Sequence, residues 1–199
     1  MPEVRRAEPA DFPVAARLLH QSAVDMYDRF AGGRERALRL LERSLARPGT
    51  ASSAEVVWLA ELDGRVAAGL AGFPVSEAVR RSTAFLRLAL RSAPPWQWLP
   101  ALRLSWVGGR AAPTPPADAF YVDALATDPG FRRRGAATAL LAEAERQALA
   151  RGLRSVALDT TEGNAEARSL YAREGFAEVA YRPAARGLPG FVALVKPLS

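Results

Sequence analysis

Apolar residues along this chain recur with two periods, and each period predicts a type of element. A spacing of three to four residues predicts helices over 11–22, with Asp11 as the cap, over 34–46, and from about 137 to 149. Stretches rich in β-branched and aromatic residues predict strands, and Asp63-Gly64 is a typical two-residue hairpin turn. The expected strands cover residues 3–7, 56–62, 65–73, 120–126, 154–160, 176–182 and 190–198, the last pairing antiparallel with 176–182.

The stretch from Phe120 to Leu141 carries the first chemical signal. An expected strand ends at the turn Asp128-Pro129-Gly130, and three arginines precede a helix that starts near Gly135. The small residues there leave backbone N–H groups unobstructed at the positive end of the helix dipole. Such a helix start suits a phosphate or pyrophosphate, although an ordinary basic helix start on the surface has the same composition. The chain contains no Walker loop, and no G-x-G-x-x-G opens a strand–helix–strand unit.

A second signal follows the expected strand at 154–160. Asn164 is placed to cap a short helix, AEARSLYARE, which ends at Gly175 with the apolar Phe176 behind it.

The two signals together resemble a known family. Arg132-x-x-Gly135-x-Ala137 resembles the Q/R-x-x-G-x-G/A signature of the GNAT superfamily of N-acetyltransferases. The pattern from Asn164 through Ala167 and Tyr171 to Gly175-Phe176 resembles the second conserved block of that superfamily, in the same order along the chain. The resemblance implies an α/β (α+β) domain whose central sheet is mixed, mostly antiparallel and twisted, with about six to seven strands flanked by helices.

The resemblance also implies acetyl-CoA as cosubstrate, without a metal. The pantetheine arm would pair with the strand backbone like an added strand, the arginine-rich loop and helix start would hold the pyrophosphate, and the second block would lie beside the CoA arm. The residues expected to bind acetyl-CoA are Leu125, Ala126, Thr127, Arg132, Arg133, Arg134, Gly135, Ala136, Ala137, Thr138, Asn164, Ala167 and Tyr171.

Two residues are the expected catalytic groups. Tyr171 matches the tyrosine that commonly protonates the leaving thiolate in this superfamily, and an ordinary tyrosine stays protonated at neutral pH, although a purely packing role is the alternative. Asp123 is an acid on an otherwise apolar strand, where burial would raise its pKa and suit it to accept a proton from the amine. The alternatives are an ordered water as base and a structural hydrogen bond for Asp123. Asp159 and Glu162 are further acids with a weaker claim.

The segment at about 74–117 is an insertion relative to a minimal family member. Its helical pattern is broken at Pro94-Pro95, and it carries three of the four tryptophans. It suits a lid over the acceptor pocket, a dimerisation surface, a membrane-surface element or simple packing on the core. We therefore expect residues 1–199 to form a single acetyltransferase domain. The insertion lies just before the strand that is expected to bind acetyl-CoA.

Composition narrows the function further. With 199 residues, no Cys and one His, the chain excludes disulfides, cysteine nucleophiles and histidine-rich metal sites. The net charge of +6 comes from residues spread along the chain, which favours steering of anionic CoA over nucleic-acid binding. Without an apolar leader or an 18-residue apolar run, a cytoplasmic protein without membrane contact is expected, and a homodimer is possible.

The expected activity is acetyl transfer to a primary amine, by direct attack within a ternary complex. The aromatic insertion favours a small molecule as acceptor. The alternatives are a protein or peptide N-acetyltransferase, an acyl-CoA-binding sensor without transfer activity, and a nucleic-acid-associated protein.

Overall fold

The computed structural model describes residues 2–111 and 113–198 and contains one seven-stranded sheet with the order β1-β2-β3-β4-β5-β7-β6. Among the strands that the structure describes, only β4 and β5 pair in parallel; the other neighbouring strands are antiparallel, including β6 with β7 as predicted. This mixed, mostly antiparallel sheet flanked by helices confirms the expected fold class. The strands are β1 Glu3–Arg6, β2 Val57–Leu62, β3 Arg65–Pro74, β4 Ala119–Thr127, β5 Ser155–Thr161, β6 Ala177–Arg182 and β7 Phe191–Pro197.

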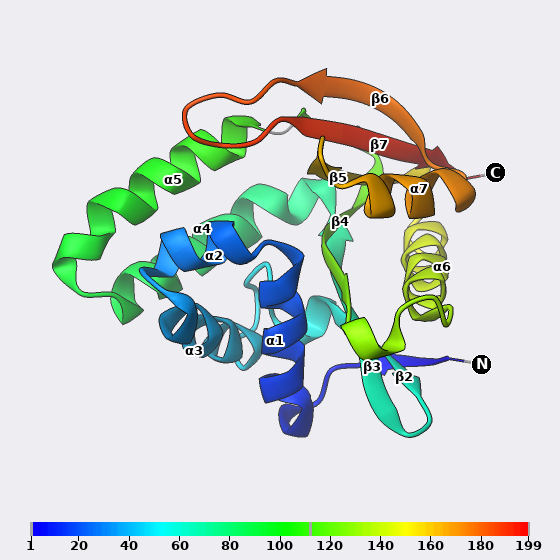
Figure 1. Cartoon of the computed structure of the whole chain (residues 1–199), viewed down its shortest axis with the longest axis horizontal. Helices are drawn as coiled ribbons and strands as arrows, with labels where there is room; N and C mark the ends of the chain where they lie inside the picture. The colour runs from blue at the N-terminus through cyan, green and yellow to red at the C-terminus, as the bar shows by residue number, and fades with distance from the viewer. Residues whose placement is uncertain (1, 112, 199) are drawn as a thin grey trace.

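Helices cover both faces of the sheet (Figure 1). One apolar cluster joins the sheet to α6, through residues such as Phe120, Val122 and Leu140. A second cluster joins the other face to α1 and α3, with Leu18 and Leu41 among its members. The helices are α1 Phe12–Ser22, α2 Val24–Ala31, α3 Arg34–Leu45, α4 Ala78–Ser92, α5 Trp98–Ala111, α6 Ala136–Leu149 and α7 Ala165–Arg173.

Local signals fixed several element ends as expected. Asp63 and Gly64 both have positive φ, 54° and 70°, which is the conformation of a type I′ hairpin turn. The Asn164 side chain accepts a hydrogen bond from the Ala167 N–H at 3.2 Å and so caps α7.

One local prediction was wrong, and one helix was not predicted. The Asp11 carboxylate does not cap α1; it accepts hydrogen bonds from the Arg5 guanidinium and from the Glu8 N–H. Helix α2 was not predicted, because its eight residues mix charged and apolar side chains and bury only Ala31.

The insertion forms α4 and α5, which pack against each other beside α2 and α3 (Figure 1). Its tryptophans point largely outward: Trp96, Trp98 and Trp106 are 73%, 46% and 52% exposed. No helix in the part of the chain that the structure describes is long and apolar enough to cross a bilayer.

Candidate active site

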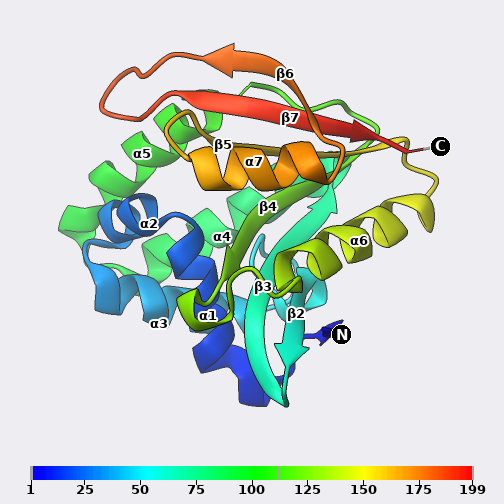
Figure 2. The same cartoon turned by 45° about the vertical axis from the view of Figure 1, so that its right-hand side comes forward.

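The candidate site lies where β4 and β5 separate. Their pairing ends at Val122 and Leu158, while β5 continues beside β7 as far as Thr161. Figure 2 shows β4 turning away from β5 and β7 as it runs toward the start of α6. Beyond Val122, β4 therefore pairs with β3 alone, through residues 124–127, and has one open backbone edge.

That open edge is formed by alternate residues. The Asp128 N–H donates to the Ala67 carbonyl at 2.8 Å, so Asp128 and Ala126 direct their backbone groups toward β3. Leu125 and Thr127 direct theirs into the gap. The Thr127 carbonyl accepts a hydrogen bond from the Gln21 side-chain amide at 3.2 Å. Of the three strand residues expected to bind the pantetheine arm, Ala126 therefore has its backbone groups committed to the sheet.

A β-bulge places Asp123. The register against β3 shifts between Ala71, which faces Ala124, and Gly72, which faces Val122, so Asp123 is the extra residue. The bulge interrupts the alternation of side chains: Val122 packs on the α6 side, whereas Ala124 packs with α1. The sequence pattern, which assumed unbroken alternation through Leu125, did not contain this shift.

Asp123 opens into a cavity of about 350 Å³. The walls come from α2, from the insertion helices α4 and α5, and from the ends of β4 and β5. The lining residues are Ala23, Met26, Tyr27, Phe30, Ala51, Ser52, Ser82, Phe85, Leu86, Leu104, Ser105, Gly108, Gly109, Tyr121, Asp123, Asp159 and Phe191. The insertion thus forms part of the cavity wall, with its tryptophans outside the lining.

The acids at the base of the cavity interact with one another. Asp159 is the first residue of β5 beyond the pairing with β4, and it accepts a hydrogen bond from the Tyr121 hydroxyl. The exposed area of Asp123 faces this cavity, and its carboxyl forms no hydrogen bond with another described residue. Desolvation by the surrounding protein disfavours the ionised carboxylate, and the negative charge of Asp159 adds to this effect. Together they raise the pKa of Asp123 to about 7. Burial also raises the pKa of Asp159, against the opposing effect of the Tyr121 hydroxyl.

Tyr171 lies near Asp159, at the end of α7. Helix α7 ends in a Schellman motif: the Phe176 N–H donates to the Tyr171 carbonyl at 2.9 Å, and Gly175 has φ 86°. The Tyr171 and Phe176 rings lie 5.8 Å apart, and Tyr171 is only 7% exposed. Burial, and then the charge of Asp159, raise the pKa of Tyr171 to about 12, so its hydroxyl keeps its proton across the neutral range.

The arginine-rich loop closes the far end of the gap. Gly135 caps α6 with φ 84°, and Arg133 also has a positive φ of 59°. The first-turn N–H groups of α6 lack intrahelical acceptors, and no bond to another described residue uses those of residues 136–138. Arg134 pairs with Asp63 at 2.6 Å and Arg132 with Glu166 at 3.6 Å, while the Thr138 hydroxyl donates to Glu174. The guanidinium groups of Arg132 and Arg134 are thus held beside the helix start, and Arg133 is exposed.

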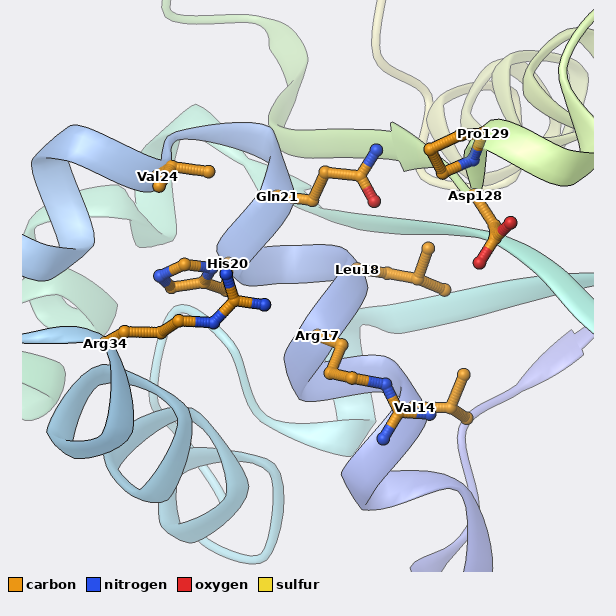
Figure 3. Close-up of a pocket in the computed structure, with 9 residues that line it drawn as sticks. All are labelled: Val14, Arg17, Leu18, His20, Gln21, Val24, Arg34, Asp128 and Pro129. Carbon is orange, nitrogen blue, oxygen red and sulfur yellow. The ribbon is translucent and has the colours of Figure 1, made fainter.

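A second cavity, of about 400 Å³, lies along α1 (Figure 3). Gln21 points from α1 toward the end of β4, and the side chains of Arg17 and Arg34 lie farther along the same cavity (Figure 3). His20 also borders it, is 3% exposed and bonds to Asp28 through Nε2 at 2.7 Å. The single histidine is therefore a buried, paired residue that does not line the Asp123 cavity.

The structure brings together predicted site residues and residues that the sequence did not single out. Asp123 and Asp159 line the same cavity from β4 and β5, and Tyr171 lies close enough to Asp159 for its charge to act on the hydroxyl. Tyr121, Tyr27 and Gln21 were not among the predicted site residues. Only Tyr121 carried a usable signal, because it has the same strand parity as Asp123.

Comparison with known proteins agrees with this architecture. The model of the acetyltransferase (GNAT) family matches residues 20–176. A crystal structure of an N-acetyltransferase from Staphylococcus aureus Mu50 is similar, with TM-score 0.75 and 19% identity over 97% of this chain and 99% of that chain. A crystal structure of an acetyltransferase has TM-score 0.69 and 21% identity over 99% of this chain and 100% of that chain.

A third similar structure is the ribosomal-protein-S18-alanine N-acetyltransferase from Escherichia coli, with TM-score 0.56 and 17% identity over 100% of this chain and 95% of that chain. The comparison with curated proteins gave no match. At these identities the solved structures establish the shared fold, and the family match covers more than half of the chain. The chain belongs to the acetyltransferase (GNAT) family.

Proposed function

We propose that this acetyltransferase moves an acetyl group from acetyl-CoA to the primary amine of a small molecule, with both substrates bound at once. The observation that carries the proposal is that the β4–β5 gap lies beside a cavity lined by Asp123 and Asp159. One substrate would occupy the gap and the other the cavity, so that direct attack needs no covalent enzyme intermediate.

The residues around the gap fit acetyl-CoA, which supplies the acetyl group as a thioester. Leu125 and Thr127 offer the outward backbone groups that an added strand, here the pantetheine amides, would pair with. Gln21 would release the Thr127 carbonyl when the arm binds. The free N–H groups at the start of α6 and the three arginines favour the pyrophosphate. Asn164 and Ala167, already engaged in the α7 cap, would contribute mainly by placing Tyr171.

The two catalytic residues have complementary proton affinities. Asp123, with a pKa of about 7, accepts one proton from the ammonium form of the amine, which frees the nitrogen lone pair for attack. The second proton, lost as the nitrogen bonds to the acetyl carbon, replaces the one that Tyr171 gives to the sulfur. Tyr171, with a pKa of about 12, donates its proton to the sulfur as the carbon–sulfur bond breaks. The pKa values of the two groups are separated in the direction that a base and an acid require.

Calorimetric titration of the protein with acetyl-CoA and CoA tests the cosubstrate site, and thiol release with a panel of amines tests transfer. Gly135→Val should abolish CoA binding, because a β-branched side chain at φ 84° distorts the start of α6. Gly152→Val is the matched control: Gly152 also has a positive φ, 67°, and open space around it, but it lies beyond the other end of α6.

Two results would contradict the proposal. Normal CoA binding by Gly135→Val would show that the helix start does not hold the pyrophosphate. CoA binding by the wild type without transfer to any amine would favour a sensor that binds acyl-CoA.

A further inference from the structure

The cavity above Asp123 has two chemically distinct ends. Its base holds the carboxyl groups of Asp123 and Asp159. Its walls are apolar or aromatic, formed by Met26, Tyr27, Phe30, Phe85, Leu86 and Leu104 from three helices. This polarity runs from β4 and β5 outward to α2, α4 and α5.

The charge balance of the lining points to a cation. Although the chain has 27 lysines and arginines, no basic side chain occurs among the described residues that line the cavity. Two acids that share a partly desolvated space repel each other, and a positively charged group between them relieves that repulsion. An amine that arrives as an ammonium ion would supply this charge and then pass its proton to Asp123.

The walls limit what the amine can be attached to. Their few polar side chains include Ser52, Ser82 and Ser105, and Ser52 interacts with Tyr27. An aminosugar or a polyamine would bury hydroxyl or ammonium groups against Phe30, Phe85 and Leu104 without partners, which costs binding energy. The volume of about 350 Å³ is at the lower end for small-molecule sites and fits a single compact molecule.

We propose that the acceptor is a primary amine on an apolar, preferably aromatic body, bound with its ammonium group at Asp123 and Asp159 and its body against the walls from α2, α4 and α5. This inference rests on the acetyltransferase function proposed above. It assigns Asp159 to ammonium binding and makes the insertion the part of the fold that determines acceptor specificity.

The test compares kcat/KM for matched amines by thiol release. One series runs from propylamine to hexylamine and continues with 2-phenylethylamine and 4-phenylbutylamine; the polar set is putrescine, ethanolamine and glucosamine. We expect kcat/KM to rise about fourfold for each methylene until the cavity is full. The phenylalkylamines should exceed the polar amines by at least about a hundredfold. Binding of the same amines to the CoA-loaded protein, measured by calorimetry, should give the same order without turnover.

Two variants locate the specificity in the cavity. Phe85→Ala should reduce the preference for the phenyl group. Gly108→Leu should move the optimum to shorter amines, because an added side chain at Gly108 meets open space on the cavity wall. It also replaces a helix-interior glycine, so it should not impair folding. Leu99→Ala is the control, since Leu99 is on α5 but 75% exposed and outside the lining.

The outcomes separate the two proposals. Absence of thiol release with every amine would overturn the acetyltransferase proposal itself. Release that is equal across the alkyl series, or that favours putrescine or glucosamine, would overturn only the acceptor assignment. An unchanged length preference in folded Gly108→Leu would likewise contradict the placement of the amine body.

Discussion

Replacing Asp123 by asparagine gives the most direct test of the proton chemistry. The change keeps the shape of the side chain and removes the group whose pKa burial and Asp159 raise to about 7. With this pKa, about a tenth of the wild-type protein carries an ionised Asp123 at pH 6, about half at pH 7 and about nine tenths at pH 8. Wild-type kcat/KM for an alkylamine should therefore rise through pH 7 and level off above pH 8.

The variant should behave differently in both rate and pH dependence. Without a base, only amine that has already lost its proton in solution reacts, so its rate should rise about tenfold per pH unit up to the pKa of the amine. At pH 7 we expect a loss of about 10²–10⁴ in kcat/KM. The measurement is thiol release between pH 5.5 and 9.5, with Asp118→Asn, an exposed acid just before β4, as the control.

The same substitution should lower the activity but raise the stability of the folded protein. A carboxyl whose pKa is raised by folding binds more protons in the folded state, so its contribution to stability declines as the pH rises from about 4 to about 7. The full shift corresponds to about 4 kcal/mol, but Asp123 keeps contact with solvent in the cavity, which reduces the expected gain from Asn to about 1–2 kcal/mol. At pH 8 the variant should melt about 2–8 °C higher than the wild type.

Two outcomes would contradict this account of Asp123. Parallel pH profiles for the wild type and Asp123→Asn would refute the assignment of Asp123 as base and would favour an ordered water. A lower melting temperature for the variant would show that Asp123 has a structural role that its geometry does not reveal.

Three further substitutions test the other parts of the site. Tyr171→Phe retains the ring packed on Phe176 and should lower kcat by about 10²–10³, with little change in melting temperature or CoA affinity. Tyr181→Phe, which alters an exposed tyrosine, is the control, and an unchanged kcat in Tyr171→Phe would exclude Tyr171 as the acid. Asn164→Ala should lower the free energy of unfolding by about 1 kcal/mol, measured as a shift in the denaturant midpoint, and Asn164→Asp should restore it; equal stability of all three proteins would contradict the capping role. Gln21→Leu removes the donor on the Thr127 carbonyl and should strengthen CoA binding if Gln21 must leave when the arm binds; weaker binding would indicate that Gln21 contacts CoA directly.

Signals carried by neighbouring residues made much of this protein predictable from its sequence. The Asp63-Gly64 turn, the Asn164 cap and the glycine that ends α7 each act within a few residues, so their chemistry determines the backbone wherever they occur. The loop before α6 is equally local, because free N–H groups and small residues at a helix start need no distant partner.

Only the tertiary structure decided how these pieces form a cavity. The bulge at Asp123 exists because β4 must keep its register with β3, and strand register depends on contacts between residues far apart in the chain. Tyr121 and Asp159 are 38 positions apart and meet only because β4 and β5 begin as parallel neighbours and then separate. Phe85 and Leu104 of the insertion line the cavity, whereas its tryptophans face outward. Hydrophobicity alone does not determine which side of α4 and α5 faces inward, because that depends on how these helices pack on α2 and α3.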